Sequence, residues 1–301
     1  MTESLPSGLC SVLVTPFTEM GAVDDGSLDR LANAMIDEGA RGLVPLAVTG
    51  ESGHLKDDER DRVVARVMAV AKGRVPVVVG VLDECTRSAA RFAGRTAQRG
   101  ASALLVAPPW TPGMPAIIEH MREVAGACGL PLVLLDYPPL RGQVLDAELM
   151  AELVDAVPQI VGIKLEGVPT LPKVAQFKAA LGDRLKIYGA SGGLHAPQML
   201  ARGVHGLMTG YAYPTHLVSI IEEARRGNPG AAAAEYARWL PLMVYVAQRG
   251  LGVALRKEVL RLRGIIDCGR VRPPTKSIDL RARMELIEVI EQTVGVARTA
   301  A

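Results

Sequence analysis

The 301-residue sequence is short of several features that would point directly to a class of protein. Its four cysteines lie far apart and form no C-x-x-C pair, which argues against a zinc knuckle and a redox dithiol. Positive and negative charges are nearly balanced, because the sequence has 34 Lys and Arg and 32 Asp and Glu. The resulting net charge of +2 leaves no surplus for a basic, nucleic-acid-binding surface.

Long apolar runs are also missing, since none approaches the roughly 18 residues that a membrane span needs. Met1–Cys10 carries Glu3 where a secretory signal peptide would be basic and then apolar. We therefore expect a cytoplasmic protein that binds neither nucleic acid nor a membrane. Apolar residues make up 49% of the sequence, which excludes a disordered chain and provides for a sizeable core.

Short apolar runs do recur, at nearly even spacing. The eight runs are Leu9–Val14, Leu43–Val48, Val75–Val81, Ala103–Ala107, Pro131–Leu135, Ile160–Leu165, Leu185–Tyr188 and Val204–Met208. Each is continuous rather than alternating, as in strands of a parallel sheet that are buried on both faces, and amphipathic stretches separate them. No G-x-G-x-x-G turn follows a run, which disfavours a doubly wound nucleotide-binding sheet. The predicted fold class is α/β, a (β/α)8 TIM barrel.

Beyond about Pro214 the strand pattern stops. Four stretches are predicted as helices: His216–Arg226, Gly230–Arg249, Gly252–Gly264 and Ser277–Val296. We therefore predict a catalytic barrel over residues 1–225 and a C-terminal helical region over residues 226–301.

Lysine is scarce, with eight residues against 26 arginines, and one lysine lies inside an apolar run. In Ile160–Glu166, strand alternation places Lys164 and Glu166 on the same face. If Ile163 and Leu165 face the helices, Lys164 points into the barrel near the strand ends that carry barrel active sites. Removal from water would lower the pKa of this amine from ~10.4 and make it a nucleophile. A lysine whose ammonium reaches solvent at the strand end is the alternative.

The other seven lysines are predicted to lie in loops, on helix faces, in the C-terminal part or at the start of a strand. They are Lys56, Lys72, Lys173, Lys178, Lys186, Lys257 and Lys276. A second candidate feature is Val48-Thr49-Gly50 at the end of the second run, where a hydroxyl and free backbone N–H groups could bind a carboxylate. An ordinary loop before a helix is the alternative there.

Together these residues resemble the dihydrodipicolinate synthase and N-acetylneuraminate lyase family. Leu43–Ser52, followed by Glu59, resembles the family's G-T-T-G-E-S…E segment, and Val161–Glu166 resembles its K-E-A or K-F-T strand. Further matches are Thr15-Pro16-Phe17, Leu130-Pro131, Pro138 and Arg272-Pro273-Pro274. The matches run in order over nearly the whole chain, so the sequence is identified as a divergent member of this family.

The resemblance implies that Lys164 forms a Schiff base with pyruvate or another 2-oxo acid, so that a neighbouring C–C or C–O bond can be made or broken. It further implies that Thr49 and nearby backbone N–H groups bind the carboxylate, and that Gly192 has a structural or loop role. No cofactor is expected beyond the covalent Schiff base. No metal is expected either, and the five histidines show no H-E-x-x-H spacing.

The sequence departs from the family where the synthase relays protons. Leu135 stands in the place of the relay tyrosine, Val48 in that of the first threonine, and Pro109-Trp110 in that of a tyrosine pair. Tyr137 lies two residues after Leu135 and, like Glu166, is a candidate replacement for the proton shuttle. The synthase's substrate-binding arginine aligns with Leu140, next to Arg141. The candidate substrate-binding residues are Thr49, Gly50, Val48, Leu135, Gly192, Met208, Arg141 and Trp110.

Three functions remain open from the sequence. The first is a Schiff-base lyase, aldolase or dehydratase acting on a 2-oxo acid, with an apolar mouth at Trp110 that favours a bulkier second substrate. The second is the dihydrodipicolinate synthase condensation, disfavoured by the missing relay hydroxyls. The third is a catalytically silent barrel that binds an oxo acid. The resemblance also implies a homo-oligomer, a dimer or tetramer, with the stiff loop Pro108–Pro112 at an interface.

Overall fold

The computed structural model describes residues 5–110, 113–141 and 145–295, with the side chain of Arg141 excepted. Eight parallel strands form one sheet in the order β2-β1-β8-β7-β6-β5-β4-β3. They are β1 (Gly8–Val12), β2 (Gly42–Val44), β3 (Val78–Val81), β4 (Ala103–Val106), β5 (Leu132–Asp136), β6 (Ile160–Leu165), β7 (Lys186–Gly189) and β8 (Gly206–Thr209). A parallel bridge between Leu43 and Val77 joins the two outer strands and closes the barrel. The predicted TIM barrel is confirmed, and each predicted run overlaps one strand.

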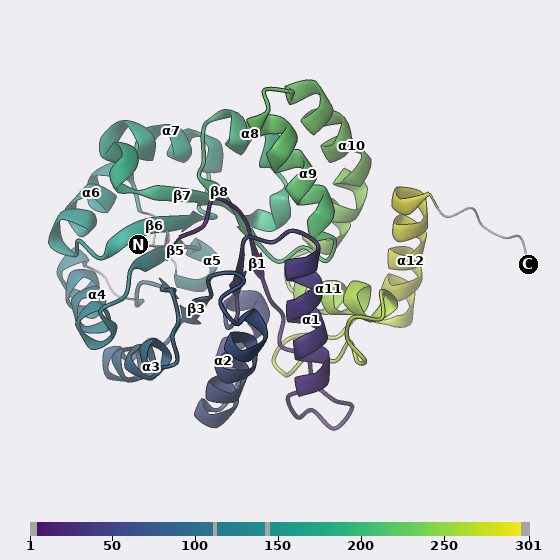
Figure 1. Cartoon of the computed structure of the whole chain (residues 1–301), viewed down its shortest axis with the longest axis horizontal. Helices are drawn as coiled ribbons and strands as arrows, with labels where there is room; N and C mark the ends of the chain where they lie inside the picture. The colour runs from purple at the N-terminus through teal and green to yellow at the C-terminus, as the bar shows by residue number, and fades with distance from the viewer. Residues whose placement is uncertain (1–4, 111–112, 142–144, 296–301) are drawn as a thin grey trace, which may run out of the picture.

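Helices surround this barrel (Figure 1). They are α1 (Asp25–Asp37), α2 (Asp57–Ala71), α3 (Thr86–Gln98), α4 (Met114–Cys128), α5 (Pro138–Arg141), α6 (Ala147–Ala156), α7 (Thr170–Leu181), α8 (Ala196–Ala201), α9 (Pro214–Arg225), α10 (Pro229–Val246), α11 (Gly252–Leu262) and α12 (Leu280–Val294). The last four overlap the four predicted C-terminal helices. In the described ranges, no helix combines the length and apolarity needed to span a membrane.

The second strand is shorter than the apolar run predicts. It ends at Val44, because Pro45 has no N–H for the ladder and Leu46 takes a left-handed φ of 60°. The chain then forms a single 3₁₀ turn over Val48–Gly50. Because the strand ends early, residues that the apolar run predicts as strand form a loop at the mouth of the barrel instead.

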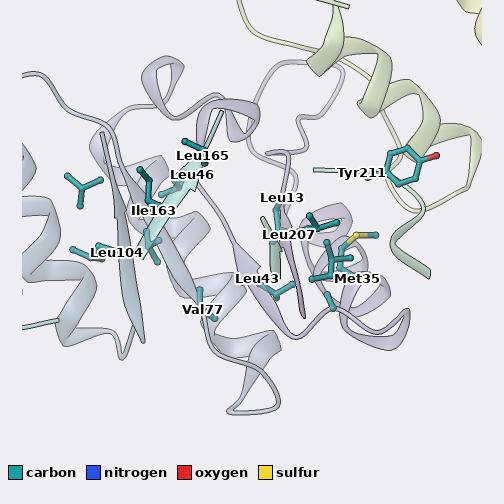
Figure 2. Packing of buried hydrophobic residues seen from close by; sticks show 14 of the residues in the cluster. Leu13, Met35, Leu43, Leu46, Val77, Leu104, Ile163, Leu165, Leu207 and Tyr211 are labelled. Carbon is teal, nitrogen blue, oxygen red and sulfur yellow. The ribbon is translucent and has the colours of Figure 1, made fainter. Parts of the chain in front are cut away.

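Side chains of each strand alternate between two hydrophobic layers. Ile163 and Leu165 belong to the outer layer between sheet and helices, and Figure 2 labels both among the packed residues of that cluster. The inner layer fills the barrel and includes Leu135 and Met208. It also includes Leu5, Cys10, Val12, Val44, Ala47, Val78, Ala103, Leu105, Ala107, Val133 and Tyr188. With the outer positions taken by Ile163 and Leu165, the residue between them faces inward.

The C-terminal helices pack on one side of the barrel. α10 packs against α9 and α8, and α12 packs against α10 and α11 at the edge of the molecule (Figure 1). α11 also reaches the barrel, because the fully buried Lys257 on this helix pairs with Glu51 in the loop after β2. The division of the chain at residue 225 stays a prediction.

Candidate active site

A cavity of about 1420 Å³ lies at the carboxyl ends of the strands. Loops after β2, β5 and β7, the ends of β6 and β8, and helix α11 contribute to its wall. The lining residues include Val48, Thr49, Tyr137, Leu140, Lys164, Glu166, Gly192, Thr209 and Arg256. A TIM barrel places its active site at this end, so the cavity is the candidate site.

Lys164 points into the barrel and reaches this cavity, as strand alternation predicts. Its backbone pairs with Leu135 of β5 on one side and with Tyr188 of β7 on the other, both of the inner layer. The residue is 5% exposed. Its Nζ lies 3.1 Å from Oε1 of Glu166, so the amine has a carboxylate beside it that can hold or accept a proton.

Burial does not by itself single out Lys164. The sequence analysis placed Lys173 on a loop or helix face and Lys257 in the C-terminal part, yet both are less exposed than Lys164. Lys173 Nζ lies 2.6 Å from Oδ2 of Asp136, and Lys257 pairs with Glu51. Neither lysine lines the cavity. Access to the cavity, rather than burial, therefore distinguishes Lys164 among these three amines.

Tyr137 and Glu166 lie on the same wall as Lys164. Glu166 is held by its backbone N–H, which donates to the carbonyl oxygen of Asp136 at 2.9 Å. Burial raises the pKa of Tyr137, and the Glu166 carboxylate adds to the rise. Among the described residues no hydrogen bond joins the Tyr137 hydroxyl to either neighbour. These two groups lie where proton transfer to a substrate on Lys164 is feasible.

The Thr49 loop offers an unused hydroxyl. Thr49 Oγ1 is buried and has no hydrogen-bond partner in the described part of the chain. Gly50 is buried beneath it, and a Cβ there would lie 3.2 Å from the carbonyl oxygen of Leu13. The hydroxyl of Thr15 donates to the carbonyl oxygen of Gly50 at 2.7 Å and fixes the turn. A free hydroxyl on a fixed turn suits a ligand carboxylate.

Glu51 anchors this loop from below. Its left-handed backbone, with φ of 53°, turns the carboxylate toward the C-terminal part of the chain. There it accepts hydrogen bonds from Lys257 Nζ and, at 2.8 Å, from the backbone N–H of Arg272. Burial lowers the pKa of Lys257 to about 8, against the effect of Glu51. Sequence analysis missed Lys257, because its partner lies 206 residues away.

The predicted substrate-binding residues divide into three groups. Val48, Thr49 and Gly192 line the cavity. Gly50, Leu135 and Met208 are buried and do not line it. Trp110 does not line it either: the residue is 72% exposed, and its backbone N–H donates to Glu84 Oε2 at 3.0 Å. Arg141 ends α5, and its side chain lies outside the described residues.

Sequence analysis also missed Arg256. This residue of α11 lines the cavity, and its Nε is buried without a hydrogen-bond partner in the described part of the chain. Burial lowers the pKa of its guanidinium, while Glu166 and Tyr137 oppose the shift. No local motif marks this arginine among 26, since only the packing of α11 against the barrel brings it to the cavity.

Metal ligands are not gathered at this site. Among residues 5–110, 113–141 and 145–295, no group of three or more His, Cys, Asp and Glu side chains could hold a metal ion. The groups that line the cavity are instead amines, guanidinium groups, imidazoles, a phenol, carboxylates and hydroxyls. Such a set can form an imine, move protons and bind carboxylates.

Comparison with known proteins agrees with this geometry. The model of the dihydrodipicolinate synthetase family matches residues 5–293. An L-2-keto-3-deoxyarabonate dehydratase of Azospirillum brasilense is 31% identical over 290 residues, 94% of this chain and 93% of its own length. A 4-hydroxy-tetrahydrodipicolinate synthase of Acidothermus cellulolyticus is 34% identical over 288 residues, 91% and 89% of the two chains.

A solved dihydrodipicolinate synthase from Rhodopseudomonas palustris has a TM-score of 0.91 and 29% identity, and covers 97% of this chain and 99% of its own. The predicted barrel and the predicted enzyme class, a Schiff-base lyase of the aldolase type, are confirmed at this level. Because the family model matches residues 5–293, a range that includes all eight strands, the loop of Thr49 and Lys164, this chain belongs to the dihydrodipicolinate synthetase family.

Proposed function

We propose that the chain is a lyase that forms a Schiff base between Lys164 and a 2-oxo acid, with pyruvate as the simplest carbonyl partner. The observation that carries the proposal is the position of Lys164 Nζ, buried in the barrel yet facing the cavity, with Glu166 Oε1 at 3.1 Å. A lysine amine can attack a ketone only where the ketone can reach it, and this cavity provides that access.

The reaction begins when Nζ of Lys164 adds to the keto carbon. The keto oxygen leaves as water, and a protonated imine forms. Glu166 or Tyr137 then removes a proton from C3, and the electron pair moves toward the imine nitrogen to give an enamine. If C4 carries a hydroxyl group, the enamine expels it as water, with a proton from the same shuttle. If the 4-hydroxyl proton is removed instead, the C3–C4 bond breaks and an aldehyde leaves.

The carboxylate of the 2-oxo acid would bind in the Thr49 loop. The unpaired Thr49 Oγ1 and the turn around Gly50 offer donors to an anion at the cavity wall. Thr49 and Lys164 both line the cavity, and the proposal places the carboxylate of one small molecule at the former and its keto carbon at the latter. No metal or organic cofactor is required for this sequence of steps.

The synthase condensation is the second candidate, and the 34% identity with the Acidothermus enzyme favours it. Against it stand Val48, Leu135 and Trp110, which leave the three relay positions without a hydroxyl group. Relay hydroxyls typically contribute about 10²–10⁴-fold to such rates. The dehydratase of Azospirillum matches this chain over a similar length, 290 residues, and its name denotes a dehydration instead of a condensation. We therefore favour a lyase or dehydratase over the synthase reaction.

Reduction with borohydride in the presence of pyruvate tests the proposal. We expect a covalent adduct on Lys164, heavier by the mass of pyruvate less one oxygen atom, located by peptide mass spectrometry. Lys164→Ala should abolish it, whereas Lys173→Ala, a matched change at a buried lysine outside the cavity, should not. No adduct near neutral pH would support the silent barrel, and an adduct on another lysine would contradict the role proposed for Lys164.

The oligomeric state and the cellular location are proposed separately from the chemistry. We infer a homo-oligomer, a dimer or tetramer, because Trp110, which follows β4, is a large apolar side chain that is 72% exposed in the single chain. Light scattering after size-exclusion chromatography measures the state directly, and Trp110→Ser should weaken the assembly. A cytoplasmic location stays a prediction.

A further inference from the structure

A buried ion pair between Asp136 and Lys173 lies next to Glu166, outside the cavity. Lys173 Nζ lies 2.6 Å from Oδ2 of Asp136, and the side chains of Lys173 and Asp136 are 5% and 1% exposed. Neither residue lines the cavity. Removing two charges from water costs about as much free energy as their attraction returns, so stability alone does not account for such a pair. The pair is therefore a candidate for a role in the neighbouring site.

The pair connects the ends of two strands. Asp136 is the last residue of β5, and its carbonyl oxygen accepts the backbone N–H of Glu166 at 2.9 Å. Lys173 belongs to α7, the helix that follows β6. The segment from Glu166 to Lys173 is thus joined to β5 at both of its ends, by a backbone hydrogen bond at Glu166 and by the ion pair at Lys173.

Gly167 shows how closely the pair packs against the backbone beside Glu166. A Cβ at Gly167 would clash with Oδ2 of Asp136 and would lie 2.7 Å from Nζ of Lys173. Both contacts are closer than the 3.0 Å that a Cβ tolerates, so any larger residue at this position would displace the pair. Both charged groups therefore lie against the residue that directly follows Glu166.

The carboxylates of Asp136 and Glu166 are also close enough to influence each other. Burial raises the pKa of Asp136, Lys173 opposes this rise, and the charge of Glu166 adds to it. Lys173 is the cation paired with Asp136, whose Oδ1 has no hydrogen-bond partner among the described residues. The ammonium of Lys173 thus compensates a negative charge next to Glu166, whose own carboxylate lies 3.1 Å from Lys164.

We propose that Asp136 and Lys173 are positioning residues, which hold the backbone at Glu166 so that its carboxylate reaches Lys164 and the proton at C3 of the substrate. They act through Glu166 and touch neither the substrate nor the amine. The inference rests on the proposed Schiff-base function. Displacement of a proton-transfer group by about 1 Å can cost about 10²-fold in rate. Imine formation uses the Lys164 amine itself, so it should persist without the pair.

Two measurements separate proton transfer from imine formation. Exchange of the methyl protons of pyruvate with D₂O, at saturating pyruvate, reports the first, and borohydride trapping at Lys164 against pyruvate concentration reports the second. We expect Lys173→Met to slow the exchange by about 10- to 100-fold and to keep half-saturation of trapping within about twofold of the wild type. Lys178→Met, at an exposed lysine of the same helix, should change neither.

Two further variants test the route of the effect. Gly167→Ala places a methyl group against Asp136 and Lys173 while both charges remain, so it should slow the exchange in the same way. Gly126→Ala on α4 is the matched control, because a Cβ there would meet no packing neighbour within 4 Å, and it should leave the exchange unchanged. In a Glu166→Gln background, Lys173→Met should add no more than about twofold, because the pair acts through Glu166.

Urea denaturation separates this effect from a loss of folding. Lys173→Met leaves Asp136 buried without a counter-charge and should lower the urea midpoint. The double variant Asp136→Asn with Lys173→Met removes both charges and should recover most of that stability, while its exchange stays slow. Exchange that recovers together with stability would show a structural role only and overturn the proposal. Wild-type exchange in Gly167→Ala, or a full effect of Lys173→Met in the Glu166→Gln background, would overturn it too.

Failure of the proposed function gives a different pattern. If pyruvate is trapped at Lys164 and exchange is equally fast in the wild type and Lys173→Met, the Schiff-base function stands and the positioning role is excluded. If the wild type neither traps pyruvate nor exchanges its protons, the Schiff-base function fails. Crystal structures of the wild type and Lys173→Met then decide the positioning role. A shift of Glu166 away from Lys164 by about 1 Å or more supports it, and an unchanged contact overturns it.

Discussion

Glu166 and Tyr137 are the two residues that we propose to move protons at the imine. Both line the cavity with Lys164, and Glu166 Oε1 is 3.1 Å from its Nζ. The family's relay tyrosine is replaced here by Leu135, which is buried beneath the cavity and carries no titratable group. We therefore assign proton transfer at C3 of the substrate to the carboxylate or the phenol.

Exchange of the methyl protons of pyruvate with D₂O, followed by NMR, isolates this step because it needs no second substrate. We expect Glu166→Gln to slow the exchange by about 10²–10⁴-fold while trapping of pyruvate at Lys164 persists. Tyr137→Phe tests the phenol in the same way. Glu285→Gln, on the distant α12, should leave the exchange rate unchanged. If neither site variant slows exchange, neither residue is the shuttle.

At the level of elements, α11 is joined to the loop after β2 by a buried ion pair. The side chains of Lys257 and Glu51 are 0% and 1% exposed. Lys257 also donates to the carbonyl oxygen of Arg270 at 2.9 Å and lies 4.1 Å above the ring of Phe17. This ion pair therefore joins the helix that carries Arg256 to the loop that carries Thr49, and both residues line the cavity.

Lys257→Met should lower the free energy of unfolding by about 3–5 kcal/mol, because it leaves Glu51 buried without a counter-charge. The double variant Lys257→Met with Glu51→Gln should recover part of this loss, since the uncompensated charge is then removed. Urea denaturation measures both. Lys178→Met, at an exposed lysine, should cost less than about 1 kcal/mol. Equal losses for the single and double variants would show that the charge is not the cause.

At the scale of the whole molecule, Arg272 connects distant parts of the chain. Its guanidinium donates to the carbonyl oxygens of Gly21 at 2.7 Å and His54 at 3.0 Å. It also forms an ion pair with Glu59 on α2, with hydrogen bonds of 2.7 and 2.5 Å. The Arg272 guanidinium lowers the pKa of Glu59 from 4.5 to about 2.

This shift predicts how stability depends on pH. A carboxyl group whose pKa is lowered by folding stabilises the folded state fully above its unfolded pKa, and loses that effect as pH falls toward the folded value. The difference in free energy of unfolding between the wild type and Glu59→Gln should therefore be largest above pH 4.5 and shrink as pH falls toward 2. Urea denaturation at several pH values measures it. A difference that stays constant with pH would contradict this role for Glu59.

The barrel could be predicted from the sequence because its signal is local. Buried parallel strands are continuous apolar runs, and Lys164 stands out as a lysine within one of them, between Ile163 and Leu165. Alternation along a strand then sets which way the amine points. The Thr49 loop was marked by its hydroxyl and glycine, and the resemblance to a family placed both features in one site.

The sequence by itself determined the fold and the direction in which Lys164 points, because each depends on neighbours within a few residues along one strand, and the order of its motifs along the chain determined the family and the class of chemistry. Tertiary structure decided which buried lysine meets the cavity and which are paired, that Leu135 and Met208 lie beneath it, and that Arg256 enters its wall. These outcomes depend on contacts between segments far apart in the chain, such as Glu51 with Lys257, 206 residues away. The local sequence pattern cannot predict such contacts, because they form only when the C-terminal helices pack against the closed barrel.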